Sequence, residues 1–152
     1  MPTTVAIWRP PSSRCTWAAP PEPLQRIHDV SVECFHRYPE AMKAGNTLRQ
    51  VWEAVRKPCE DAGLDYIELG FHGHGLTSPE FPTVVYKPGE GILDGRGIGD
   101  LVLRENMVFG TNIDIHDPSW NRHVGHMLGD MILVTAEGGK QMTQTPTDRF
   151  AK

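Results

Sequence analysis

Two histidines, His72 and His74, stand two residues apart where short apolar runs begin. If this segment is extended, both imidazoles point to the same face, because successive side chains of a strand alternate. Asp114 stands in a later apolar run, two residues beyond Asn112, and shares a strand face with it. Two histidines and one carboxylate form a ligand set for first-row metals. The pattern indicates a candidate metal or substrate-binding cluster of His72, His74 and Asp114.

The same residues also have a structural interpretation. Histidines beside glycines can hydrogen-bond to the backbone of a turn, and Asp114, His116 and Asp117 stand just before Pro118. Such residues are more often structural than catalytic, so we expect His72 and His74 to be turn histidines and the three later residues to form a turn.

The elements that must position these residues follow from hydrophobic spacing. Apolar residues recur at helical spacing from Pro23 to Ala44, which predicts a helix that Pro39 bends or ends early. Thr47 and Gln50 match a capping box ahead of a second helix, which ends by Gly63. Short apolar runs then predict strands at 66–71, 83–86, 101–103, 107–115 and 131–135. Two helices followed by strands indicate an α+β domain.

Composition indicates a globular chain with no nucleic-acid or membrane function. The 152 residues are 39% hydrophobic and 22% charged, which fits one domain spanning residues 1–152, with proline-rich irregular segments or edge strands in residues 1–20. The net charge of -4 lacks the basic patch that binds phosphates or anionic lipids. No apolar run approaches the roughly 20 residues that span a bilayer, so we expect a cytoplasmic protein.

The remaining residues that could do chemistry carry weaker signals. Cys15, Cys34 and Cys59 are odd in number and lack a CxxC spacing, so we expect reduced thiols. His123 and His126 could line a pocket, but we expect them to face solvent. The three residues Trp17, Trp52 and Trp120 could shape a substrate pocket, but tryptophan is more often a packing residue.

Four sequence blocks, in order over roughly residues 12–150, carry a family resemblance. Segment 71–82 is similar to a Gly-His-Gly-Ile-Gly…His-Glu-x-Pro stretch, with Glu80 and Pro82 retained and Pro79 in place of its second histidine. Segments 13–17, 105–109 and 129–135 are similar to a Thr-Arg-Thr-Phe strand, a Gly-Met-Val-Phe-Thr-Ile-Glu-Pro strand and a Glu-Asp-Thr-Val-Leu-Val-Thr strand. Together they resemble the methionine aminopeptidase, Xaa-Pro dipeptidase and creatinase superfamily.

The resemblance implies a fold. Members of this superfamily have a pseudo-symmetric "pita-bread" α+β domain. We expect this chain to supply its second half, with two helices followed by a curved, mostly antiparallel sheet, as an N-terminally truncated catalytic-like domain.

The resemblance also implies a metal centre, and this chain departs from it. Active members hold two divalent ions, such as Mn, Co, Zn or Fe, with two aspartates, one histidine and two glutamates. Matched position by position, the histidine is His74, the glutamates fall at Asn112 and Gly129, and one aspartate falls at Pro11. The other aspartate would precede Pro11, where no acidic residue stands. With one of five ligands retained, we expect an impaired or absent dinuclear site.

The expected function is that of an Xaa-Pro aminopeptidase- or dipeptidase-like hydrolase, acting on a peptide or small C–N substrate if active. His74 and Glu80 are then the catalytic candidates, and His72 and Asp114 the substrate-binding ones. One alternative is a non-catalytic pseudoenzyme or fragment that serves binding or dimerisation, and a homodimer would cover unpaired sheet edges. Another is a metal-free, creatinase-like C–N hydrolase in which His74 is the acid or base, oriented by Glu80 or Asp114.

Overall fold

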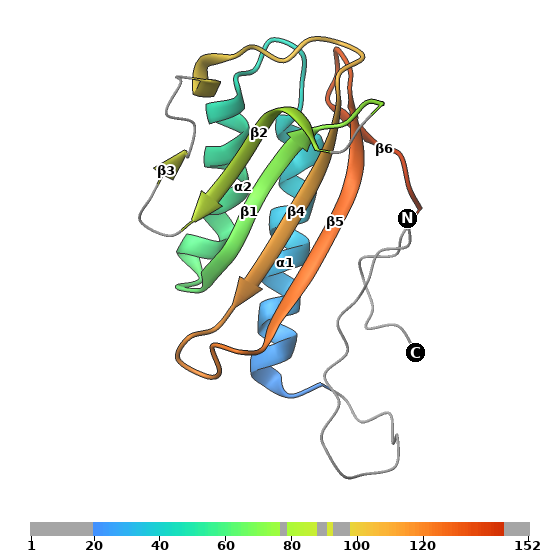
Figure 1. The fold of residues 1–152 in the computed structure, drawn as a ribbon. Coiled ribbons are helices and arrows are strands. Elements are labelled where there is room, and N and C mark those ends of the chain that lie inside the picture. Colours follow the sequence, from blue (N-terminus) through green and yellow to red (C-terminus); the bar gives the residue numbers. More distant parts are fainter. Residues whose placement is uncertain (1–19, 77–78, 88–90, 93–97, 145–152) are drawn as a thin grey trace.

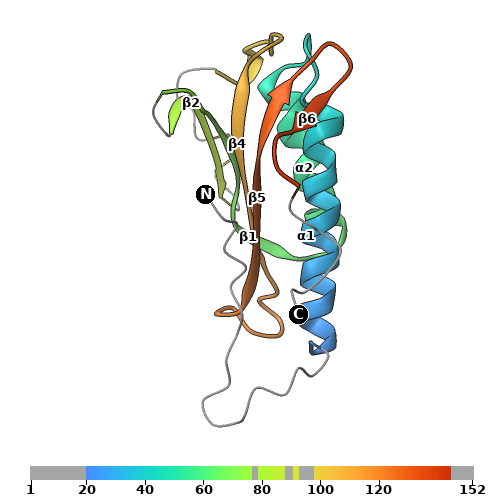
Figure 2. The ribbon, with the colours of Figure 1, turned by 90° about the vertical axis from the view of Figure 1, so that its right-hand side faces the viewer.

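The computed structural model describes residues 20–76, 79–87, 91–92 and 98–144. Its described part has two α-helices packed on one face of a six-stranded sheet, and the other face is turned away from them (Figures 1 and 2). The elements are α1 (Glu22–Ala41), α2 (Leu48–Asp61), β1 (Asp65–Gly73), β2 (Glu80–Lys87), β3 (Gly91–Ile92), the 3-10 helix η1 (Ile98–Asp100), β4 (Val108–His116), β5 (Gly125–Val134) and β6 (Gly139–Gln141).

The sheet order is β3-β2-β1-β4-β5-β6, with every neighbouring pair antiparallel. Two helices followed by an antiparallel sheet confirm the predicted α+β class. The prediction for residues 1–20 falls almost entirely on residues 1–19, which lie outside the described residues, as do Pro11, Cys15 and Trp17. Neither described α-helix has an apolar stretch that could cross a bilayer.

Both helices begin and end close to the predicted positions. The Thr47 side chain accepts a hydrogen bond from the Gln50 backbone, and the Gln50 side chain accepts one from the Thr47 backbone N–H. This reciprocal pair confirms the capping box. Helix α1 continues through Pro39 and ends at Ala41, not Ala44.

Two of the predicted strands need correction. Segment 101–103 is not a strand of the sheet. Its backbone forms hydrogen bonds with the start of α2 and with the connection before it: Leu48 N–H donates to Leu101 O, and Leu103 N–H donates to Asn46 O. Strand β5 begins at Gly125, well before the predicted residue 131. Its first half was missed because Gly125 and Gly129 interrupt the apolar pattern, although even-numbered side chains are buried along the whole strand.

The core lies between the helices and the sheet. Its largest fully buried side chains include Phe35 and Tyr38 of α1, Phe71 of β1 and Phe109 of β4. The Phe71 ring meets the Tyr38 and Phe109 rings edge to face, with centroids 6.0 and 5.8 Å apart. The Tyr38 hydroxyl donates to the Gly70 carbonyl at 2.8 Å, so this buried side chain of α1 also holds β1 in place.

The core also encloses the thiols of Cys34 and Cys59, one from each helix. Burial raises the pKa of both thiols to about 12. Because the thiolate is the reactive form, these cysteines remain protonated and act as packing residues.

A buried histidine pair joins α1 to β5. His28 and His126 are each 6% exposed, and their rings meet edge to face with centroids 4.9 Å apart. The prediction that His126 faces solvent is wrong, since the alternation of β5 turns this residue toward α1; His123, in the preceding turn, is exposed as expected. Burial, with a smaller contribution from His28, lowers the pKa of His126 from 6.5 to about 4.

This pair predicts acid destabilisation. The unfolded chain binds a proton at His126 below pH 6.5, whereas the folded chain binds it only near pH 4. The full stability of the fold is therefore present above the pKa of His126 in the unfolded chain, 6.5, and is lost as the pH falls toward its pKa in the folded chain, about 4. The loss of stability is about 2 kcal/mol at pH 5. Urea unfolding of wild type and His126→Gln at pH 7.5 and pH 5 measures it. In wild type the free energy of unfolding should be lower at pH 5 than at pH 7.5, and in His126→Gln this difference should be much smaller. The control His123→Gln should keep the wild-type difference. A wild-type difference in His126→Gln would refute the assignment.

Candidate functional site

One face of the sheet is turned away from the helices (Figure 2), and we call it the outer face. Polar residues of β1 and β4 lie on it. Leu69 and Phe71 of β1 point into the core, so Glu68 and His72 point outward, and Asn112, Asp114 and His116 of β4 do the same between the buried Thr111, Ile113 and Ile115. The outer-face residues Glu68, His72, Asn112, Asp114 and His116 are all half-buried. We call these five residues the polar row.

The two histidines of the β1 end lie side by side. Their ring centroids are 6.1 Å apart. His72 lies over Gly110 of β4, where an added Cβ would come within 2.6 Å of the imidazole Cε1, and its Nδ1 lies 3.0 Å from the Gly73 carbonyl oxygen. His74 follows the last residue of β1 and donates its backbone N–H to Val108 O at 2.9 Å. The Nδ1 atom of His74 is buried and has no hydrogen-bond partner among the described residues.

The centre of the polar row is a contact between Asn112 and Glu68. The Asn112 Nδ2 donates to the Glu68 Oε1 at 3.2 Å. Asp114 stands opposite Glu68 in the β1–β4 register. Burial raises the pKa of Asp114; the nearby charge of His116 opposes that rise, and the charge of Glu68 adds to it. Sequence reasoning missed Glu68, although it shares its strand parity with His72.

Asp114 and His116 are strand residues, so the expected turn begins only at Asp117. The Asp117 carboxylate accepts hydrogen bonds from the Ser119 backbone and hydroxyl, and it pairs with Arg26 of α1 at 2.9 Å. The hydrogen bond from the Ser119 hydroxyl has the largest of the effects that lower the pKa of the Asp117 carboxyl. The expected turn at Asp114 and His116 was wrong because the alternation of β4 continues to its last residue.

The candidate residues of the polar row do not converge on one point. His72 pairs with Gly110, whereas Asp114 lies four residues further along β4, a separation of about 13 Å at the usual rise of a strand. Asp114 therefore lies on the same face as His72 and His74 but is too far from them to bind the same metal ion. Glu80, the first residue of β2, is nearer to the histidines: a Cβ added at Gly75 would lie 2.4 Å from its Oε2.

Asn112 and Gly129 stand opposite each other in the β4–β5 register. A Cβ added at Gly129 would lie 2.4 Å from the Thr111 carbonyl oxygen and 3.6 Å from the Asn112 Oδ1. The first distance is to backbone, so a side chain at position 129 requires the strands to move. Glycine here permits a close approach of β5 to β4.

The outer face does not fit a pair of divalent ions. Such ions need several oxygen or imidazole ligands gathered around them. No group of three or more His, Cys, Asp or Glu side chains in the described part of the chain is close enough to hold one ion. At the two positions where the resemblance implies glutamates, Asn112 directs an amide N–H toward Glu68, and Gly129 has no side chain.

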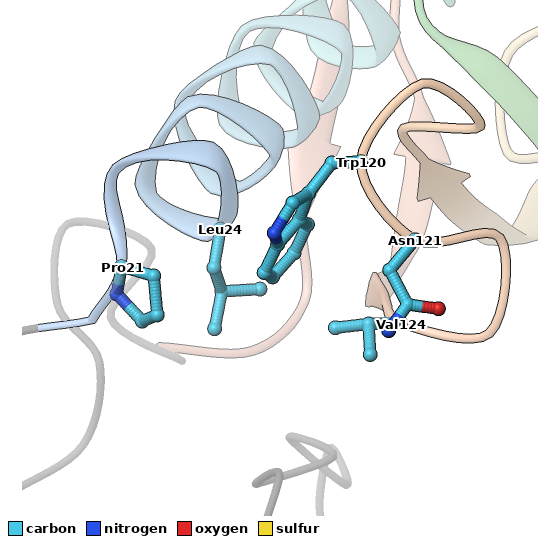
Figure 3. A pocket seen from close by; sticks show the side chains of 5 residues that line it. All are labelled: Pro21, Leu24, Trp120, Asn121 and Val124. Atoms are coloured by element: carbon cyan, nitrogen blue, oxygen red, sulfur yellow. The ribbon is translucent and has the colours of Figure 1, made fainter.

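A small pocket lies elsewhere, where the start of α1 meets the β4–β5 connection (Figure 3). Pro21, Leu24, Trp120, Asn121 and Val124 line it. Trp120 is 39% exposed and so lines the pocket instead of packing in the core as expected. None of the five lining side chains is an acid or a base at neutral pH, so this pocket offers shape and no acid–base chemistry.

The structure resembles solved prolidases and a methionine aminopeptidase. The prolidase from Pyrococcus horikoshii OT3 is 26% identical, with a TM-score of 0.68 over 86% of this chain and 34% of that one. The prolidase from Pyrococcus furiosus is 25% identical, with a TM-score of 0.67 over 84% of this chain and 34% of that one. The methionine aminopeptidase from Rickettsia prowazekii, at 17% identity and a TM-score of 0.55 over 78% of this chain and 50% of that one, shares the fold.

The chain thus spans about a third of the length of the prolidases that it matches. No curated protein sequence matches it. The model of metallopeptidase family M24 matches residues 11–136, which is most of the sequence. The structural neighbours confirm the predicted pita-bread superfamily and the α+β half-fold within it. The chain belongs to metallopeptidase family M24.

Proposed function

We propose that this chain is an Xaa-Pro peptidase-like member of family M24 that has lost the two-metal centre and does not catalyse metal-dependent peptide hydrolysis with its own residues. The observation that carries this proposal is the pairing of Asn112 with Gly129 across β4 and β5. The resemblance puts the two metal-binding glutamates at these positions. In this proposal the chain keeps the family's fold but lacks the family's metal-dependent chemistry.

The chemistry of a two-metal peptidase explains why these two positions decide the question. Carboxylates neutralise the ions and hold a bridging water as the nucleophile. A neutral amide at position 112 adds no charge, and its N–H is already donated to Glu68. Glycine at 129 contributes no ligand. His74 alone has the family's residue type among the described positions, and one imidazole does not hold two ions.

The polar row supports a binding role in place of hydrolysis. Glu68 and Asp114 offer carboxylates to a cationic group such as a peptide ammonium. A short peptide lying along β1 and β4 would meet both carboxylates. This is the non-catalytic alternative in a specific form, with a peptide as the ligand.

A second candidate, metal-free C–N hydrolysis, is favoured by one observation. The Nδ1 of His74 has no partner in the described part of the chain, and the Glu80 carboxylate lies against Gly75, the residue that follows His74. A histidine paired with a carboxylate is the usual composition of a general acid–base pair, and here the carboxylate lies against the residue that follows the histidine. In this candidate His74 would transfer the proton and Glu80 would orient the imidazole.

The first prediction of the proposed function concerns metal ions. Calorimetric titration of the chain with MnCl2, CoCl2 and ZnCl2, with elemental analysis of the purified protein, should show no stoichiometric tight binding. Hydrolysis of an Xaa-Pro dipeptide should not increase on addition of these ions. Two tightly bound ions per chain, lost in His74→Ala and kept in the exposed control His36→Ala, would contradict the proposal. Hydrolysis that resists EDTA and is lost only in His74→Ala would favour the metal-free hydrolase.

The second prediction concerns the close approach at Gly129. Gly129→Ala should destabilise the fold by about 1–3 kcal/mol, because the added methyl meets the Thr111 backbone carbonyl. Gly75→Ala is the matched control, since the atoms nearest to its added methyl belong to the Glu80 side chain and not to the backbone, and it should cost less than about 0.5 kcal/mol. Urea unfolding measures both. Equal stability of the two variants would show that β4 and β5 do not require glycine at position 129.

A further inference from the structure

The outer face holds two carboxylates that face each other. Glu68 of β1 and Asp114 of β4 are partners in the strand register, and both are half-buried. Side chains at such positions have Cβ atoms about 4.5–5.5 Å apart, and like charges placed directly opposite destabilise a sheet. A face of this kind needs a cation or hydrogen-bond donors to hold it in one arrangement.

The groups around this pair include one donor with a defined contact. The Asn112 Nδ2 donates to the Glu68 Oε1 at 3.2 Å. His116, two residues beyond Asp114 on β4, has a charge that favours ionised Asp114 when protonated. On the other side of β4, the residues opposite positions 112 and 114 are Gly129 and Met127, neither of which titrates. The Asn112 amide is thus the neutral donor between β1 and β5.

We propose that Asn112 is a positioning residue that takes the place of a cation, because its amide holds the Glu68 carboxylate and so orders the outer face without a divalent ion. This inference rests on the proposed loss of the two-metal centre and explains how the sheet tolerates that loss. A carboxylate at position 112 would have no N–H to donate. It would also place a third negative charge beside Glu68 and Asp114.

Gly129 lies opposite Asn112 in the β4–β5 register. A Cβ at residue 129 would lie 3.6 Å from the Asn112 Oδ1, which is an ordinary van der Waals distance, and 2.4 Å from the Thr111 carbonyl oxygen. The β4 backbone, and not the Asn112 amide, is therefore what requires glycine at position 129. The hydrogen bond from Asn112 to Glu68 is compatible with that close approach of the two strands.

The test compares four variants of the whole chain by thermal unfolding at pH 7 and pH 4, with EDTA or with millimolar MnCl2. Asn112→Asp removes the donor and adds a charge. Asn112→Ala removes the donor alone. Glu68→Gln removes the acceptor's charge. The double variant Glu68→Gln with Asn112→Asp exchanges donor and acceptor, so that an amide at position 68 can donate to a carboxylate at position 112.

In EDTA at pH 7, Asn112→Asp should lower Tm by roughly 4 °C, and at pH 4, where carboxylates protonate, by less than about half of that. MnCl2 should restore the Tm of Asn112→Asp at pH 7 and leave wild type unchanged. The exchanged double variant should recover most of the loss in EDTA. Asn112→Ala should also lose less stability at pH 4 than at pH 7, because the carboxylate that its amide holds is charged only at the higher pH, and it should lose less than Asn112→Asp because it adds no charge.

The outcomes separate this inference from the proposed function. If Asn112→Asp and Asn112→Ala lose the same stability at both pH values and neither responds to MnCl2, Asn112 is only a packing residue and the inference fails, while the loss of the metal centre stands. If MnCl2 raises the Tm of wild type in a saturable way, the donor set does bind a cation and both fail. Far-UV circular dichroism at 20 °C, a temperature chosen at roughly the maximum of protein stability, confirms that each variant is folded before melting.

Discussion

The pairing of β4 between β1 and β5 is the constraint on which the rest of the molecule depends. Strand β4 pairs with β5 along its whole length and with β1 from Phe109 to His116. Since side chains alternate along it, one register sends Phe109, Ile113 and Ile115 into the core and Asn112 and Asp114 to the outer face. The core and the candidate site are therefore two sides of one strand, and a slip of one residue would exchange them.

Two contacts hold the sheet around β4 against α1, and a further set holds β6 against β5. The Tyr38 hydroxyl of α1 donates to the Gly70 carbonyl at 2.8 Å, which holds β1 beside β4. Arg26 of α1 pairs with Asp117, directly after β4. Asp130 of β5, which is 8% exposed, accepts hydrogen bonds from the side chains of Gln141 and Thr143 and so holds β6 and the residues after it against the sheet. The outer face is thus supported from behind by a core that does not require a metal.

The local spacing of apolar residues predicts the helices and most strands. It does not predict which residues of different strands and helices come into contact. The capping box of Thr47 and Gln50 is a short-range pattern, and the structure forms it as expected. The segment 101–103 misled because a short apolar run has the same composition whether it pairs in a sheet or bonds to a helix connection. The burial of His126 and the contact of Asn112 with Glu68 depend on which strands and helices lie opposite, and this is set by tertiary pairing.

The central claim, that this M24 domain orders its outer face without a metal pair, is tested most directly by anomalous diffraction from crystals grown with excess MnCl2. The account predicts no manganese peak within ligand distance of His74 or Asn112, and a Glu68 carboxylate still bonded to the Asn112 amide. Two manganese peaks about 3.5–4 Å apart beside His74, the spacing of a two-metal centre, would contradict it.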